Sequence, residues 1–382
     1  MSIAHASSRP ETTIRLNGLD HLRALAITLV FLFHYGKLFP HPEWIESISK
    51  FGWTGVDLFF VLSGFLISSQ LFSSIKKTGN FSYREFFIKR FFRIIPAYLV
   101  VVTLYFLFPL LREREGLAPL WRYLTFTQNF GLDLRYFGTF SHAWSLCIEE
   151  QFYFLLPMTL LLLLSIKRLR IGGWLLGLLF IGGFIIRLTI WNAQIEPVLD
   201  TELFGLTWYK WIYYPTFCRL DSLLVGVALA AIMHYGSGIK TVIERWGNWL
   251  LVAGLAVLSI AYVVCLEELS FTASIYGFPL VAVGYGLLVA SAISPSCLLY
   301  KYSSRLTNGI ATLSFGIYLI HKIIIHITQA KLEPIAEADT TIVFICSVML
   351  SIIAALVLYK IVEAPMLHLR HTILRKEKPQ YA

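Results

Sequence analysis

Charged residues are scarce in this chain: they occupy 14% of its 382 positions, whereas apolar residues occupy 57%. A water-soluble domain of this size does not need so much apolar surface, and apolar segments of about twenty residues recur along the sequence. Helices are the usual way to cross lipid because they satisfy their own backbone hydrogen bonds. The composition therefore predicts an all-α, polytopic helical membrane protein.

Several catalytic and binding motifs are also missing. The five cysteines show neither C-x-x-C nor disulfide spacing, and the histidines show no metal-binding spacing such as H-E-x-x-H. There is no G-x-S-x-G nucleophile elbow and no phosphate-binding glycine loop. The sequence thus supports no metal site, and the distribution of its net charge of +9 along the chain does not point to nucleic acid as a partner.

Ten segments are long and apolar enough to span a bilayer: 19–38, 54–75, 94–111, 144–165, 172–191, 211–233, 248–265, 273–293, 309–329 and 340–361. With a cytoplasmic N-terminus, the cytoplasmic connections hold 19 Lys and Arg residues and the outward connections hold eight. This excess fits the positive-inside rule, so both termini are predicted to be cytoplasmic. The chain then divides into a cytoplasmic tail (1–18), a membrane domain (19–365) and a second cytoplasmic tail (366–382).

The first apolar segment carries ionisable side chains that a spanning helix normally excludes. Arg23 and His34 lie eleven positions apart, which returns to nearly the same helix face about 16 Å further along the axis. An ionised group at the centre of a spanning helix costs about 2.5–3.5 kcal/mol, which favours a functional role for His34. Arg23 can equally well extend to the lipid headgroups without any further role.

The densest group of charges follows the second apolar segment, where Lys89, Arg90 and Arg93 alternate with phenylalanines. This pattern predicts an amphipathic segment at the inner membrane surface. Its basic residues have two possible roles. They either set the topology and attract anionic membrane lipid, or also bind the phosphates of a cytoplasmic ligand.

Further ionisable residues lie within the predicted spans: Asp57, Glu149, Glu150, Arg219, Asp221 and His321. At 1.5 Å per residue, His34 and most of these groups fall within one layer about 10 Å deep in the outer half of the membrane, which predicts a polar cavity. Structural explanations remain open. Thr54-x-x-Asp57 before an apolar segment matches a capping box, so a role in capping the helix is favoured for Asp57. Arg219 and Asp221 are offset by two and cannot face each other on one helix, so each must find a partner elsewhere.

A histidine beside a carboxylate is the minimal assembly for general base catalysis, because the imidazole takes a hydroxyl proton and the carboxylate orients it. A base without a nucleophile of its own indicates direct attack by an acceptor hydroxyl on a bound activated group. The alternative is a transporter in which the intramembrane charges form a relay, although no inverted repeat is visible in the sequence.

Seven stretches together resemble the acyltransferase-3 family of bacterial membrane acyltransferases. They are LDHLRALAITLVFLFHYG, GWTGVDLFFVLSGFLIS, KRFFRIIPAYL, SHAWSLCIEEQFYFLLP, FCRLDSLLVGVALA, SFGIYLIH and VEAP, and they occur in family order between residues 19 and 365. The resemblance implies about ten membrane helices and transfer of an acyl group, usually acetyl, from cytoplasmic acyl-CoA to a sugar hydroxyl presented outside.

By the same resemblance, Arg23 and His34 form the family's essential pair, with His34 as the catalytic base. Glu149 or Glu150 falls on the acidic motif of the family. One departure is His21, because the family usually has glycine there and a side chain could narrow the inner vestibule.

Lys89, Arg90 and Arg93 fall on the family's basic motif, and the resemblance implies that they receive the CoA phosphates. We therefore expect an O-acyltransferase of the bacterial inner membrane with acetyl-CoA as co-substrate. In the expected mechanism His34, oriented by a carboxylate such as Glu149, deprotonates the acceptor hydroxyl, which attacks the thioester; a covalent acyl relay is the alternative. The expected partners are a lipid-linked or cell-envelope glycan and membrane lipid. The polar groups expected to line or support the cavity are Asp57, Arg219, Asp221 and His321.

Overall fold

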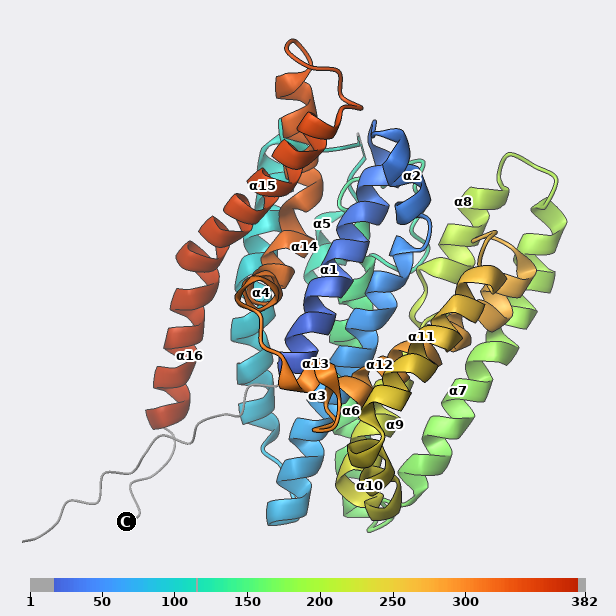
Figure 1. Ribbon diagram of the computed structural model, residues 1–382, viewed down its shortest axis with the longest axis vertical. Coiled ribbons are helices and arrows are strands. Elements are labelled where there is room, and N and C mark those ends of the chain that lie inside the picture. The colour runs from blue at the N-terminus through green and yellow to red at the C-terminus, as the bar shows by residue number, and fades with distance from the viewer. Residues whose placement is uncertain (1–16, 115, 377–382) are drawn as a thin grey trace, which may run out of the picture.

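The computed structural model describes residues 17–114 and 116–376, which form helices and loops without any β-strand. The long helices run roughly parallel or antiparallel to one another in a single bundle (Figure 1). They are α1 (Asn17–Leu38), α3 (Gly55–Thr78), α4 (Tyr83–Leu107), α6 (Trp144–Ser165), α7 (Ile171–Ile190), α9 (Asp221–Tyr235), α11 (Gly247–Val264), α12 (Phe278–Ala292), α14 (Arg305–Leu332), α15 (Thr341–Leu358) and α16 (Ala364–Lys376). The predicted all-α, polytopic fold is confirmed.

Shorter helices connect the long ones: α2 (Glu43–Ser49), α5 (Leu120–Leu124), α8 (Phe204–Trp208), α10 (Ser237–Arg245) and α13 (Leu298–Lys301). Single turns of tighter, 3₁₀ geometry are η1 (Gly52–Thr54), η2 (Pro109–Leu111), η3 (Ser141–Ala143), η5 (Glu196–Val198) and η7 (Thr216–Cys218). Wider π turns are η4 (Trp191–Ile195), η6 (Tyr209–Tyr213), η8 (Ala273–Gly277) and η9 (Tyr359–Glu363), and three of them extend or prolong a long helix.

Within the described residues, eight helical segments are long and apolar enough to span a membrane, or nine if α9 and α10, which meet at 103°, form one bent span. The polar α1 is not one of the eight. The total of ten spans and the cytoplasmic location of both termini therefore stay predictions. Most of the two predicted tails, 1–18 and 366–382, lies outside the described residues, and residues 366–376 continue the last helix as α16.

The segment 211–233, predicted as one span, is broken. The π turn η6 is followed by Pro215 and the turn η7, and α9 begins only at Asp221. Pro215 itself is extended, with φ −67° and ψ 135°, and its missing backbone N–H removes a helical hydrogen bond, which explains the break. Arg219 and Asp221 therefore lie at the start of a helix, and not two or three turns inside one as predicted.

Close helix packing positions the polar groups of the bundle. α1 packs against α3, α12 and α14, while α3 has its most extensive interface with α9. This interface depends on glycine: a Cβ on Gly64 would lie 2.3 Å from the backbone oxygen of Leu223, and a Cβ on Gly226 would lie 2.3 Å from that of Val61. Small residues such as glycine let the backbones of two membrane helices pack this closely, and a larger side chain would clash.

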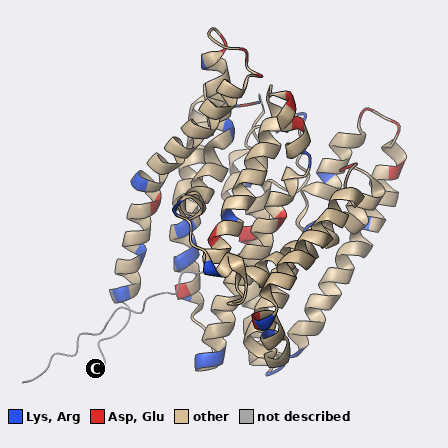
Figure 2. Ribbon diagram, in the orientation of Figure 1, with Lys and Arg blue, Asp and Glu red and all other residues tan. Residues whose placement is uncertain are grey.

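One end of the bundle is the more basic. α1 and α4 begin, and α3 ends, at the lower end of the bundle in Figure 1, and Figure 2 shows Lys and Arg along the lower part of α4 and on α16. Following the predicted topology, we call the end at which α1 begins the inner end and the opposite end the outer end.

Candidate active site

α1 carries both Arg23 and His34, and the two side chains line different cavities. Arg23 lines an inner cavity, where its guanidinium also lies 3.5 Å from Asp20. His34 lines an outer cavity, and Val56 of α3 borders both spaces. The first helix therefore connects two neighbouring sites.

The inner cavity has a volume of about 160 Å³ and lies among α1, α3, α4, α6 and α14. Its polar lining comprises three guanidinium groups, one carboxylate and several hydroxyls, from Arg23, Arg90, Arg93, Glu149, Ser63, Ser145, Ser314, Tyr153 and Tyr318. Among the described lining residues three cations face one carboxylate, and two further carboxylates outside the lining, Asp20 and Glu363, pair with Arg23 and Arg93. Such a cavity attracts an anionic ligand.

The basic residues of α4 have different surroundings. Arg93 lies 3.3 Å from Glu363, while the buried Nε of Arg90 has no hydrogen-bond partner in the described part of the chain. Lys89 forms an ion pair at 2.6 Å with Glu85 of its own helix and is not among the residues that line the cavity. The structure thus brings Arg90 and Arg93 to the cavity and leaves Lys89 apart.

A row of polar contacts crosses the wall of the inner cavity. The Tyr153 hydroxyl donates to Glu149 Oε2 at 2.7 Å and also contacts the hydroxyl of Ser63. Glu150 does not line the cavity, and its buried Oε1 has no partner among the described residues. Since neighbouring helical residues are about 100° apart, only Glu149 of the two faces the inner cavity.

The outer cavity is smaller, with a volume of about 60 Å³. Its polar lining includes His34, Lys37, Arg114, Ser141 and His142, and its aromatic lining consists of Phe33, Trp53, Trp144, Tyr209, Tyr213 and Tyr214. None of the described residues that line it is a carboxylate. The outer cavity is therefore cationic and strongly aromatic.

Three histidines meet at the outer cavity, with ring centroids 4.9 Å (His34 to His321), 5.1 Å (His142 to His321) and 5.6 Å (His34 to His142) apart. His321 Nε2 lies 3.0 Å from His34 Nδ1. His321 Nδ1 lies 3.0 and 2.9 Å from the carbonyl oxygens of Ile317 and Tyr318. We call these three residues the histidine cluster.

The protonation pattern of the histidine cluster follows from its contacts. Carbonyl oxygens only accept hydrogen bonds, so Nδ1 of His321 carries the proton and its Nε2 is a lone-pair acceptor in the neutral ring. His34 then donates from Nδ1, which leaves its own Nε2 unprotonated. His321 thus holds His34 in the tautomer that can accept a proton at Nε2.

The structure corrects two expectations about this site. Glu149 lines the inner cavity, and the group within hydrogen-bond distance of His34 Nδ1 is the His321 imidazole and not a carboxylate. The ionisable groups also do not form a single layer, because η3 packs beside His34 before α6 begins. Glu149, five residues further along α6, consequently lies deeper than a count from the membrane surface gives.

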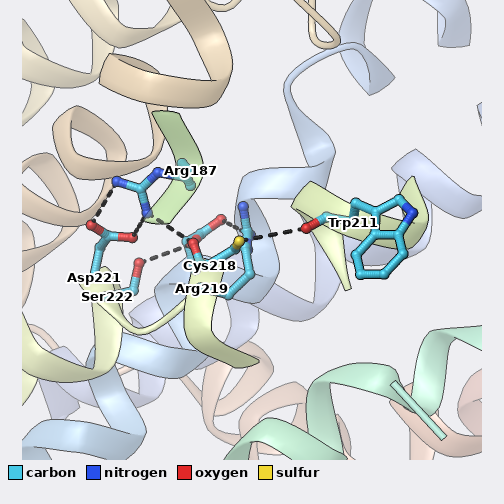
Figure 3. A network of polar contacts seen from close by, with 7 residues as sticks. Arg187, Trp211, Cys218, Arg219, Asp221 and Ser222 are labelled. Carbon is cyan, nitrogen blue, oxygen red and sulfur yellow. Dashed lines mark hydrogen bonds and ion pairs between the residues drawn. The ribbon is translucent and has the colours of Figure 1, made fainter. Parts of the chain in front are cut away.

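A separate network of buried ion pairs joins α3, α7 and α9 (Figure 3). Arg187 donates to the two carboxylate oxygens of Asp221 at 2.6 and 3.2 Å. Arg219 donates to Asp57 at 2.9 Å, and the Ser222 hydroxyl donates to the other oxygen of Asp57 at 2.9 Å. Arg219 and Asp221 thus have partners on different helices, as their offset of two requires.

The interpretation of Asp57 as a helix cap is wrong. The Thr54 side chain makes no capping hydrogen bond to α3, and the Asp57 carboxylate instead pairs with Arg219. Asp57, Arg219 and Asp221 also do not line either cavity. Of the four residues predicted to line or support the polar cavity, His321 belongs to the candidate active site, and the other three join helices.

The outer connection between α4 and α6 is fixed to the bundle. Glu113 forms a buried ion pair at 2.7 Å with Lys322 of α14 and accepts a hydrogen bond from the Phe140 amide. Further along this connection, the Arg135 guanidinium donates to Asp133 and thereby lowers the pKa of that carboxyl. The loop can therefore hold His142 in place beside the histidine cluster.

Sequence reasoning assigned no role to His142, to the Lys322–Glu113 pair or to Arg187. His142 lies two residues before the start of α6, in the sequence SHAW, and outside the predicted span 144–165. The sequence feature that could have identified His142 is a histidine just before the start of a predicted spanning helix. In the described residues, no group of three or more His, Cys, Asp or Glu side chains is arranged to hold a metal ion.

The fold and the two cavities define a polytopic membrane protein with a basic inner site and a histidine cluster at an outer site. The chain belongs to the acyltransferase-3 family, because the family model described as an acyltransferase domain matches residues 16–360. The resemblance noted in the sequence is confirmed. No solved structure shows significant similarity to the chain.

Curated relatives are known from Staphylococcus aureus. The O-acetyltransferase OatA of strain NCTC 8325 / PS 47 is 28% identical over 380 residues, which cover 92% of this chain and 57% of the relative. OatA of strain MRSA252 is 28% identical over 400 residues (96% and 60%). A protein of strain COL, provisionally named an O-acetyltransferase, is 29% identical over 371 residues (91% and 56%). The chain thus spans somewhat more than half the length of these relatives.

Proposed function

We propose that this protein is an O-acyltransferase of the bacterial inner membrane, which moves an acyl group from cytoplasmic acyl-CoA to a hydroxyl of an envelope glycan. The observation that carries the proposal is the presence on one helix of Arg23, in a basic inner cavity, and His34, in the histidine cluster. An offset of eleven helical positions places the two about 16 Å apart along the axis. The names of the relatives support acetyl as the acyl group.

Arg23, Arg90 and Arg93 fit the phosphates of a CoA donor. A guanidinium donates two parallel hydrogen bonds to a phosphate, and the buried Nε of Arg90 has no partner among the described residues. Among the described lining residues Glu149 is the only carboxylate, and Asp20 and Glu363 pair with Arg23 and Arg93 from outside the lining. The donor supplies a thioester, whose carbonyl carbon is the centre that the acceptor attacks.

His34 is the general base in this proposal. Its Nε2 takes the proton of the acceptor hydroxyl while the hydroxyl oxygen forms a bond to the acyl carbon. The carbon–sulfur bond then breaks, and the proton held by His34 passes to the departing thiolate. His321 acts through His34, because the hydrogen bond to Nδ1 fixes the tautomer and orients the ring.

The outer cavity suits a sugar acceptor that is presented at the outer face. Six aromatic rings supply apolar faces with polar edges, and Lys37 and Arg114 supply cationic donors. Such a lining can hold the apolar face of a sugar ring while leaving its hydroxyls free to react. A lipid-linked or cell-envelope glycan meets these requirements.

Isotope-labelled acetyl-CoA tests the proposal in membranes that contain the protein and the host's envelope glycans. We expect acetyl-CoA consumption and label in the glycan fraction. A transporter would move solute without consuming acetyl-CoA, and that result would contradict the proposal. Mass spectrometry of glycans from a deletion strain and its parent should show the loss of an acetyl group, and identical spectra would rule out a glycan acceptor.

A further inference from the structure

His142 is a buried imidazole in the outer cavity to which the reaction described above assigns no role. Its residue is 2% exposed, and neither ring nitrogen has a hydrogen-bond partner among the described residues. A neutral imidazole carries one donor and one acceptor. Leaving both unpaired in a buried site is unfavourable, so the ring is suited to pair with a group of a bound ligand.

The position of His142 is fixed although its ring nitrogens are unpaired. The Tyr318 hydroxyl donates to the backbone carbonyl of His142 at 2.5 Å. The imidazole makes edge contacts with the rings of Phe140 and His321, with centroids 5.0 and 5.1 Å away. A rigidly held donor of this kind stabilises developing charge without reorganisation during the reaction.

We infer that His142 is a second catalytic residue, which donates its ring N–H to the acyl carbonyl oxygen in the transition state. This inference rests on the proposed function. When the acceptor oxygen bonds to the acyl carbon, the carbonyl electron pair moves onto that oxygen. His142 stabilises the charge by a hydrogen bond and transfers no proton. The carbonyl re-forms when the carbon–sulfur bond breaks.

The contacts of the histidine cluster favour this role over that of a second base. His34 has a lone pair at Nε2 because His321 holds its Nδ1–H. His142 has no such side-chain partner among the described residues, so its ring can take the tautomer that presents an N–H to the substrate. The neighbouring Lys322 is engaged by Glu113 at 2.7 Å and therefore does not supply a free ammonium for the oxyanion.

The variants His142→Ala and His142→Gln test the inference in membranes supplied with acetyl-CoA and the host's glycans. We expect His142→Ala to lower kcat by about 10²–10³-fold, the usual effect of removing one oxyanion donor, with KM for acetyl-CoA little changed. His142→Gln, which keeps an N–H donor, should recover part of this loss. The acidic limb of the pH profile should persist in His142→Gln, because His34 remains the base.

Two results would overturn the inference. One is a kcat of His142→Ala close to that of the unmodified protein, and the other is disappearance of the acidic limb in His142→Gln, which would make His142 the base. The amount of inserted protein and its binding of CoA show whether His142→Ala folds. If His142→Ala does not fold, the activity of His142→Gln decides: partial activity supports the inference, and an inactive but folded His142→Gln contradicts it. Inactive His34→Ala beside active His142→Ala would reject this inference alone, whereas active His34→Ala would reject the proposed function.

Discussion

Removal of the His321 imidazole tests whether this ring holds the proposed base, His34, in its reactive tautomer. His321 receives the Nδ1–H of His34 at 3.0 Å and is itself fixed by two backbone carbonyls of α14. In His321→Ala, His34 loses this acceptor, so its ring can turn or take the other tautomer. It would then present an N–H to the acceptor hydroxyl in place of a lone pair.

The size of the effect follows from the role of the base. A positioned general base contributes about 10²–10⁴-fold to a rate, and an imidazole in the wrong tautomer supplies little of it. We therefore expect His321→Ala to lower kcat by at least about 10²-fold. His321→Gln should retain more activity, because its amide oxygen can accept the hydrogen bond. CoA release from acetyl-CoA, followed with a thiol-reactive dye in isolated membranes, measures both.

The double variant separates a shared role from two independent ones. Residues that act as one unit are not additive, so His34→Ala combined with His321→Ala should be no slower than His34→Ala alone. Multiplied losses would refute the dependence of His34 on His321. Full activity of correctly inserted His321→Ala would refute it as well.

Three further predictions concern the packing and the donor site. Asp57→Ala leaves Arg219 as a buried cation without its partner and should lower the free energy of unfolding by about 3–5 kcal/mol. The thermal unfolding transition in detergent should therefore shift to a lower temperature, and an unchanged transition temperature would contradict a stabilising role of the Asp57–Arg219 pair. Gly64→Leu should prevent the close approach of α3 and α9 and reduce the yield of folded protein in size-exclusion chromatography. The control Gly177→Leu should not reduce the yield, because a Cβ added there meets nothing within 4 Å. Equal yields of the two variants would argue against the close packing of α3 and α9. Arg90→Ala should raise KM for acetyl-CoA by about tenfold or more while changing kcat little, and an unaltered KM would exclude Arg90 from the donor site.

The helices could be predicted from the sequence because long apolar segments have few stable locations outside lipid. The break before α9 was missed because the apolar count across 211–233 outweighed the single Pro215. The placement of Arg23 and His34 on one face of one helix was predictable for a simple reason. It depends only on local helical geometry, which a spacing of eleven determines.

The partners of these residues could not be predicted in the same way. His34 and His321 are 287 positions apart, and Arg187 and Asp221 are joined only because α7 packs beside α9. Tertiary packing decides such pairs, so a carboxylate was the generic choice for orienting His34. The position of His142 could not be predicted, because a loop that packs beside α1 has the same sequence pattern as one that remains at the surface.

His34 is the residue on which the proposed acyl transfer most directly depends. We propose to measure acetyl transfer from labelled acetyl-CoA in membranes that contain equal amounts of inserted wild-type protein, His34→Ala and the control His41→Ala, since His41 lines neither cavity. We predict that His34→Ala lowers the rate by about 10²–10⁴-fold while His41→Ala leaves it unchanged. Transfer at the wild-type rate by inserted His34→Ala would contradict the central claim.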